Sequence, residues 1–67
     1  MRILRLKDVI EKTGLARSTI YKHIDLGIFP KPVPLGGRAV GWVDSELQEW
    51  ISERIRERDG RASEPMG

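Results

Sequence analysis

Apolar residues recur at helical spacing in two short stretches near the start of the chain. In the first stretch, Val9 and Ile10 follow Asp8, whose carboxylate suits the positive end of a helix dipole. The second stretch runs from about Ala16 to Leu26. Between them, Gly14 is expected to adopt a left-handed conformation, which ends a helix without strain and turns the chain. Two helices joined by so tight a turn predict a helix-turn-helix.

The apolar residues around this turn are expected to form its core. Ile20 and Ile24 lie one helical turn apart and define the buried side of the second helix. Leu15 is expected to fill the space between the two helices. After a second glycine ends the second helix, Ile28 and Phe29 are expected to return to the core.

A proline-rich stretch and a glycine pair follow, and they predict a short hairpin. Three prolines at alternate positions from Pro30 forbid a helix and hold the chain extended. Because proline donates no ladder hydrogen bond, the first strand should be short or lie at an edge. Gly36-Gly37 is a strong two-residue turn signal. The residues that alternate on its two sides are Val33, Leu35, Val40 and Trp42.

A last apolar stripe at helical spacing predicts a third helix, capped by Asp44 or Ser45. The stripe is expected to pack on the core, while the charged residues around it are solvated. Beyond Arg58 the sequence has no periodicity and several helix breakers. We therefore expect one domain over residues 1–58 and a flexible tail over residues 59–67. The residues of the stripe are Leu47, Trp50, Ile51 and Ile55.

These elements predict a mainly α fold with a small β-hairpin, a winged helix-turn-helix of three helices plus a wing. The 67 residues suffice for one small domain without a deep substrate cavity. Since the chain has no cysteine and His23 is its only histidine, no disulfide, metal site or cofactor is expected. No apolar run approaches the roughly 20 residues that span a bilayer, and no signal peptide is evident. We expect a cytoplasmic protein with no membrane partner.

The outward face of the second helix carries polar groups that suit DNA. When the isoleucines face inward, Ser18 and Lys22 point most directly outward, with one polar residue on either side. Hydroxyl and ammonium groups bind phosphates or base edges. Arg17 lies in the first turn beside the helix amides, and Arg38 beside the hairpin tip can reach a flanking phosphate or the minor groove. The candidate DNA-binding residues are Arg17, Ser18, Thr19, Tyr21, Lys22 and Arg38.

Charge is distributed unevenly along the chain, although the net charge is only +2. Residues 1–43 carry eight Lys or Arg and three Asp or Glu, a net charge of +5. Residues 44–67 carry four Arg and seven Asp or Glu, a net charge of −3. An ordinary mixed surface is one explanation. The other is that the first two thirds of the chain face a polyanion while the third helix faces elsewhere.

The run from Leu4 to Ile51 resembles the AlpA family of small prophage-associated regulators, within the broader set of MerR-like and excisionase-like winged helices. The shared motifs are TGL, RSTIY, FP, the P-V-L-GG-R pattern of the hairpin and two spaced tryptophans. The resemblance implies a DNA-binding transcriptional regulator, often encoded in prophages or other mobile elements. It also implies that the six candidate residues belong to the recognition helix and the wing.

Two positions depart from the family pattern. The residue before Arg17 is usually a serine that caps the helix, and here it is Ala16. The residue before Trp42 is often basic, and here it is Gly41, which removes one wing contact. The helix start is therefore expected to fray or to use another hydrogen-bond partner, and the loss of the basic residue is expected to weaken DNA binding.

Two other binding functions compete with transcriptional regulation. An excisionase-like recombination directionality factor would bend DNA with the same helix and wing. A protein-interaction module would use the third helix and bind no DNA. Catalysis is not expected, because no Ser, His and acid set has motif spacing and there is no thiol. The expected partner is double-stranded DNA, with no small-molecule substrate. One module buries only about 600–1,000 Å² on DNA, so a homodimer or a tandem multimer is expected.

Overall fold

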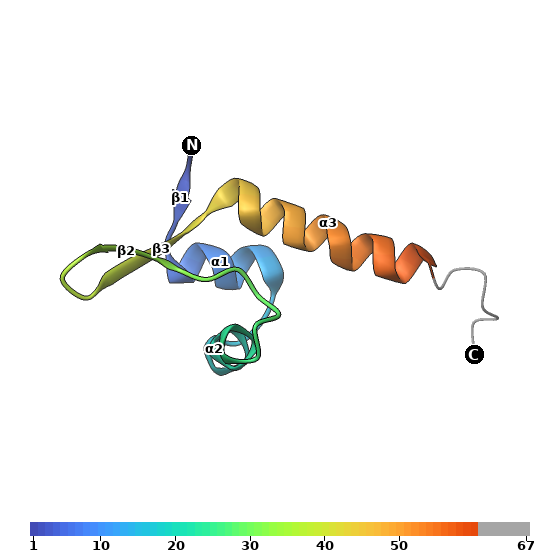
Figure 1. The fold of residues 1–67 in the computed structure, drawn as a ribbon, viewed down its shortest axis with the longest axis horizontal. Coiled ribbons are helices and arrows are strands. Elements are labelled where there is room, and N and C mark those ends of the chain that lie inside the picture. Colours follow the sequence, from blue (N-terminus) through green and yellow to red (C-terminus); the bar gives the residue numbers. More distant parts are fainter. Residues whose placement is uncertain (61–67) are drawn as a thin grey trace.

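The computed structural model describes residues 1–60 and contains three helices and a small antiparallel sheet. This architecture confirms the predicted mainly α winged helix-turn-helix. In Figure 1, α1 lies between α2 and α3, and the hairpin extends in the direction opposite to the end of α3. The elements are β1 (Ile3–Leu4), α1 (Leu6–Thr13), α2 (Arg17–Asp25), β2 (Val33–Gly36), β3 (Ala39–Val43) and α3 (Asp44–Gly60).

Helix α1 begins earlier than its apolar spacing predicts and ends as predicted. It starts at Leu6, and the Arg5 backbone N–H donates a 3.1 Å hydrogen bond to the carboxylate of Asp8. Asp8 therefore serves the first turn as a capping acceptor as well as a favourable charge. At the other end Gly14 has φ 73°, and its N–H donates a 2.8 Å hydrogen bond to the Ile10 carbonyl. The left-handed glycine turn is confirmed.

The hydroxyl of Thr13 fixes the turn between the two helices. Its Oγ1 donates a 2.8 Å hydrogen bond to the Val9 carbonyl and accepts one of 3.2 Å from the Leu15 N–H. One side chain thus satisfies a backbone group at the end of α1 and another just after it. The side chain of Leu15 packs against the core, as predicted.

The sheet has three strands, of which the sequence predicts two. Strand β3 lies in the centre, with β1 and β2 antiparallel on either side. Ile3 pairs with Val43 and Leu4 pairs with Trp42. A two-residue strand is too short to show an alternating pattern, so β1 could not be predicted. It joins the start of the chain to the wing.

The turn of the hairpin lies one residue later than predicted. Gly36 belongs to β2 and pairs with Ala39, so the two turn residues are Gly37 and Arg38. Pro34 pairs with Val40, and the register shifts between Pro34 and Gly36. Such a shift accommodates one extra residue in β2 and increases the local twist. Arg38 therefore belongs to the turn itself.

One buried side chain from each of five elements and one from the loop after α2 form the core. Two predicted core residues are wrong: Ile28 is 48% exposed and Ile55 is 42% exposed. Ile28 comes directly after the turn at Gly27, where the chain has not yet reached the core. Ile55 lies one helical turn beyond Ile51, the last α3 residue packed on the core. The six buried residues are Leu4, Val9, Ile20, Phe29, Trp42 and Leu47.

The two tryptophans fix the connection between α2 and the wing. The Trp42 indole is fully buried and donates a 3.0 Å hydrogen bond to the Pro30 carbonyl. Trp50 is half-buried and donates a 2.7 Å hydrogen bond to the Ile28 carbonyl. Its ring also packs edge-on against Phe29, with 4.8 Å between ring centroids. Each indole therefore satisfies a backbone carbonyl of the segment after α2.

Gly41 is buried within β3, and this offers a structural reason for its departure from the family pattern. A Cβ atom there would lie 3.1 Å from the Leu4 carbonyl oxygen, 3.1 Å from Leu35 Cδ1, and in steric overlap with the Ile3 side chain. The short β1 strand thus occupies the space that a larger residue would need. A basic residue at this position would have to displace β1.

Replacing Gly41 with alanine should therefore destabilise the protein by about 1–3 kcal/mol, the usual cost of overpacking. The measurement is urea unfolding followed by circular dichroism. Gly60→Ala is the matched control, because a Cβ atom there meets no heavy atom within 4 Å. Equal stability of the two variants would show that β1 yields without cost.

Helix α3 continues two residues past the expected domain end, to Gly60. Residues 59 and 60 of the expected tail are thus helical, and residues 61–67 lie outside the described part of the chain. Within residues 1–60, no helix combines the length and apolar character needed to cross a bilayer.

Candidate nucleic-acid interface

The outward face of α2 is as the helical geometry predicts. Ile20 is fully buried and Ile24 is packed against the core, so the opposite side of the helix faces solvent. Ser18 and Lys22 are exposed there, and Tyr21 is 41% exposed. Thr19 is half-buried, so its hydroxyl is the least accessible of the set. The exposed groups combine hydroxyls, a phenol and an ammonium on one helical surface.

The start of α2 also faces solvent, and no side chain caps it. Ala16 occupies the N-cap position with φ −71° and ψ 155° and makes no side-chain hydrogen bond. No other side chain replaces the expected serine cap, yet the helix begins at Arg17 and its first backbone hydrogen bond, from the Ile20 N–H to the Ala16 carbonyl, is formed at 3.0 Å. Arg17, the first residue of the helix, is exposed. Unpaired N–H groups at a helix N-terminus attract anions, and a neighbouring arginine adds to that attraction.

Arg38 lies at the tip of the wing, separate in sequence from α2. It is exposed and follows Gly37, whose φ is 57°. The structure thus provides two positively charged surfaces, one on α2 and one on the wing, joined by the segment that the tryptophans fix.

The cations of α2 and the wing form no ion pairs within residues 1–60, whereas the arginines of α3 do. Among residues 1–60, the ion pairs involve Lys12 and the α3 arginines. No ion pair or side-chain hydrogen bond in that part of the chain engages any of the six candidate residues. The positive charges of α2 and the wing are therefore available to an external anion.

Lys31 is a further exposed cation, outside the six residues predicted from the sequence. It lies between Pro30 and Pro32 in the segment joining α2 to the wing, and the Trp42 indole holds the Pro30 carbonyl. The two flanking prolines were the signal that could have identified it, because they limit the backbone freedom of the residue between them. Because it lies in the segment between α2 and the wing, we add Lys31 to the candidate surface.

Lys12 is paired within the domain and lies outside this surface. Its ammonium donates a 2.7 Å hydrogen bond to the Asp44 carboxylate and so joins α1 to the first turn of α3. This hydrogen bond lowers the pKa of Asp44 below its ordinary value of 3.8, and the positive charges of Lys12 and Arg2 lower it further. The contact positions α3 relative to the helix-turn-helix.

The lowered pKa of Asp44 predicts a stability contribution that depends on pH. A carboxyl whose pKa is depressed on folding stabilises the protein above its unfolded pKa, here 3.8, and loses that effect as the pH falls through the folded pKa. In an NMR titration, the Asp44 carboxyl should titrate below pH 3.8 in the wild type and close to that value in Lys12→Met. Identical midpoints in the two proteins would show that the contact does not persist in solution.

The comparison with known proteins identifies the family. Residues 2–55 match the family described as prophage CP4-57 regulatory protein (AlpA), a span that covers the helix-turn-helix, the wing and most of α3. The chain is 45% identical over 62 residues to the DNA-binding transcriptional activator AlpA of Escherichia coli K12, covering 84% of this chain and 89% of that protein. It is 47% identical over 57 residues to the uncharacterized protein ORF88 of Enterobacteria phage P4, covering 85% of this chain and 65% of that protein. The chain belongs to the AlpA family of prophage regulatory proteins.

Proposed function

We propose that this protein is a sequence-specific DNA-binding transcriptional regulator of a prophage or mobile element, acting on DNA in the cytoplasm. The observation that carries the proposal is the unpaired polar and cationic face of α2, set in a helix-turn-helix of a family of prophage regulators. The name of the Escherichia coli relative, a DNA-binding transcriptional activator, supports the same function.

In this proposal α2 enters the major groove. Ser18, Tyr21 and Lys22 contact base edges or phosphates, as polar side chains on recognition helices do. Thr19 contributes from the side of the helix, where it is half-buried. Arg17 and the open N-terminal amides of α2 bind a backbone phosphate. The base contacts provide sequence specificity and the phosphate contacts fix the orientation of the helix.

The wing binds beside the major-groove site. Arg38 reaches the flanking backbone or the minor groove from the hairpin tip, and Lys31 binds a phosphate between the two contacts. A single module of this size buries about 600–1,000 Å² on DNA, at the lower end for specific complexes. The protein therefore binds its operator as a homodimer or as several copies on tandem sites.

Titration of the purified protein against the DNA upstream of its own gene tests the proposal. The experiment uses two salt concentrations and an excess of random DNA as competitor. We expect specific binding whose affinity falls as salt rises, because each phosphate contact releases counterions. A folded protein that prefers no DNA fragment over random sequence would contradict the proposal.

A further inference from the structure

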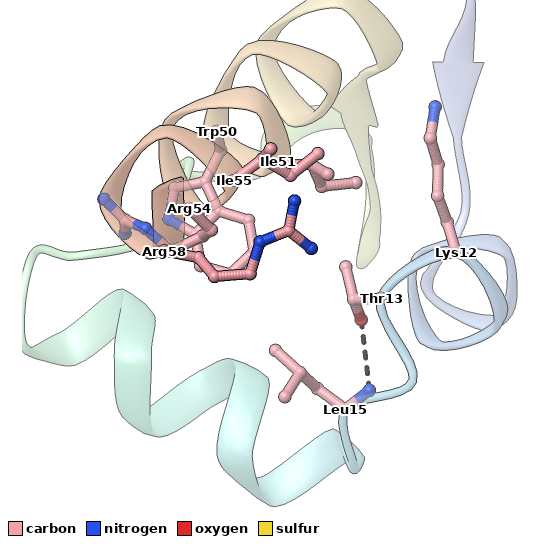
Figure 2. Close-up of a pocket in the computed structure, with 8 residues that line it drawn as sticks. All are labelled: Lys12, Thr13, Leu15, Trp50, Ile51, Arg54, Ile55 and Arg58. Carbon is pink, nitrogen blue, oxygen red and sulfur yellow. Dashed lines mark hydrogen bonds between the residues drawn. The ribbon is translucent and has the colours of Figure 1, made fainter. Parts of the chain in front are cut away.

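An apolar groove of about 310 Å³ lies between the end of α1 with its following turn and the C-terminal half of α3. We refer to it as the α1–α3 groove. Figure 2 shows Leu15 facing it from the turn, and Trp50, Ile51 and Ile55 facing it from α3. None of the six candidate DNA-binding residues lines it. The groove is therefore a separate surface from the proposed DNA interface.

The groove exists because the C-terminal half of α3 extends beyond the hydrophobic core. Packing on the core ends at Ile51, yet the helix continues for nine further residues to Gly60. Ile55 extends the apolar stripe into this overhang and remains 42% exposed. Within residues 1–60, no other segment covers that side of the overhang, so apolar surface is left open to a partner.

Every charged side chain that lines the groove is a cation. These are Lys12, Arg54 and Arg58, and no Asp or Glu side chain lines it. The carboxylates that pair with them, those of Asp44, Glu53, Glu57 and Asp59, lie outside the lining. The ion pairs of the two arginines are largely exposed and weak, so an incoming carboxylate can compete for Arg54 and Arg58, whereas Asp44 holds the Lys12 ammonium. The groove thus combines an apolar floor with a positive rim.

We propose that the α1–α3 groove binds an acidic amphipathic segment of a protein partner, which inserts apolar side chains and directs carboxylates at Arg54 and Arg58. Its volume is at the lower end of ligand pockets and suits a few side chains of a docked helix. The charge argues against a second copy, because a twofold pairing through this face would bring the same cations together. It also argues against DNA, whose phosphates cannot fill an apolar floor.

The experiment is an NMR titration of the full chain with a synthetic amphipathic peptide of about 14 residues, roughly four helical turns. The peptide carries leucines at helical spacing and glutamates on either side of them. A second peptide with every glutamate replaced by lysine is the charge control. We expect the acidic peptide to shift the amide signals of the groove residues and to bind about tenfold more tightly than the basic peptide, since Arg54 and Arg58 attract the glutamates and repel the lysines.

Matched variants separate the rim from the rest of α3. Arg58→Glu should weaken binding of the acidic peptide about fivefold or more, whereas Arg56→Glu, the same charge change outside the groove lining, should leave it within about twofold. Ile55→Asp should abolish binding, whereas Leu35→Asp, at a residue with the similar exposure of 44%, should not. Circular dichroism establishes that each variant is folded.

Three results would overturn the proposal. One is equal affinity for the acidic and basic peptides, and another is the absence of groove shifts up to about 1 mM peptide. The third is a change of the groove signals on dilution of the protein alone, which would make a second copy the occupant. DNA binding is measured on the same variants, and Arg58→Glu should retain it. Loss of peptide binding can therefore be distinguished from loss of DNA binding.

Discussion

Replacing Trp42 by alanine is expected to unfold the protein. Trp42 is fully buried on the central strand, pairs with Leu4 of β1, and bonds the Pro30 carbonyl. Removing a buried tryptophan costs about 3–5 kcal/mol. The change also leaves the Pro30 carbonyl without its indole donor, which costs about 1–3 kcal/mol if that carbonyl stays buried. A chain of 67 residues has a total stability of only about 3–10 kcal/mol.

Thermal unfolding followed by circular dichroism measures this effect. The comparison variant is Trp50→Ala, which should be less severe because Trp50 is only half-buried, although its ring packs edge-on against Phe29. The melting temperature of Trp42→Phe should fall between those of the wild type and Trp42→Ala. This variant keeps an aromatic ring in the core but loses the hydrogen bond to the Pro30 carbonyl. A Trp42→Ala protein that melts cooperatively near the wild-type temperature would show that the sheet does not depend on this residue.

Removing two unpaired cations of the proposed interface, Lys22 and Arg38, should together weaken DNA binding by about 30-fold at 0.15 M salt. The estimate follows from counterion release, which contributes about fivefold per phosphate contact at this salt concentration. Lys22→Ala/Arg38→Ala should also lower the salt dependence, with a slope reduced by about 1.8 in a plot of log affinity against log salt. Both residues are exposed, so the stability should not change.

The matched control replaces Arg56, an exposed cation of α3 that pairs with Glu53 inside its own helix. Arg56→Ala should leave DNA affinity and salt slope unchanged, because its charge is outside the proposed interface. If the double variant also binds like the wild type, α2 and the wing are not the DNA surface. The single variants then show whether one of the two positions carries the whole effect.

The helical part of the fold was predictable because its signals are local. The left-handed Gly14 and the inward spacing of Ile20 and Ile24 depend only on residues within one or two turns, and the structure confirms them. Strand β1 was missed because two residues carry no periodicity, and its position depends on pairing with β3 far along the chain. Ile28 and Ile55 were misplaced for a related reason, since apolar spacing does not show where the core ends.

The candidate site followed from the same local geometry. Once the buried side of α2 is known, helical spacing identifies the outward residues, and the structure places Ser18 and Lys22 on the surface accordingly. The hairpin turn was predicted one residue early, since the register shift in β2 depends on how Pro34 and Gly36 pair across the sheet. Which of these residues touch DNA stays a prediction, to be measured by the variants above.

The two indole hydrogen bonds have a consequence for the geometry of an operator. Trp42 and Trp50 hold the Pro30 and Ile28 carbonyls from β3 and from α3, so the peptide between α2 and the wing is held at two points. In the proposed complex with DNA, this connection would set the distance between the contacts that α2 and the wing make on the duplex. Inserting one base pair between these two contacts would move the wing's site along the duplex and rotate it by about a tenth of a turn. The wing would then lose its contact while α2 stayed in place.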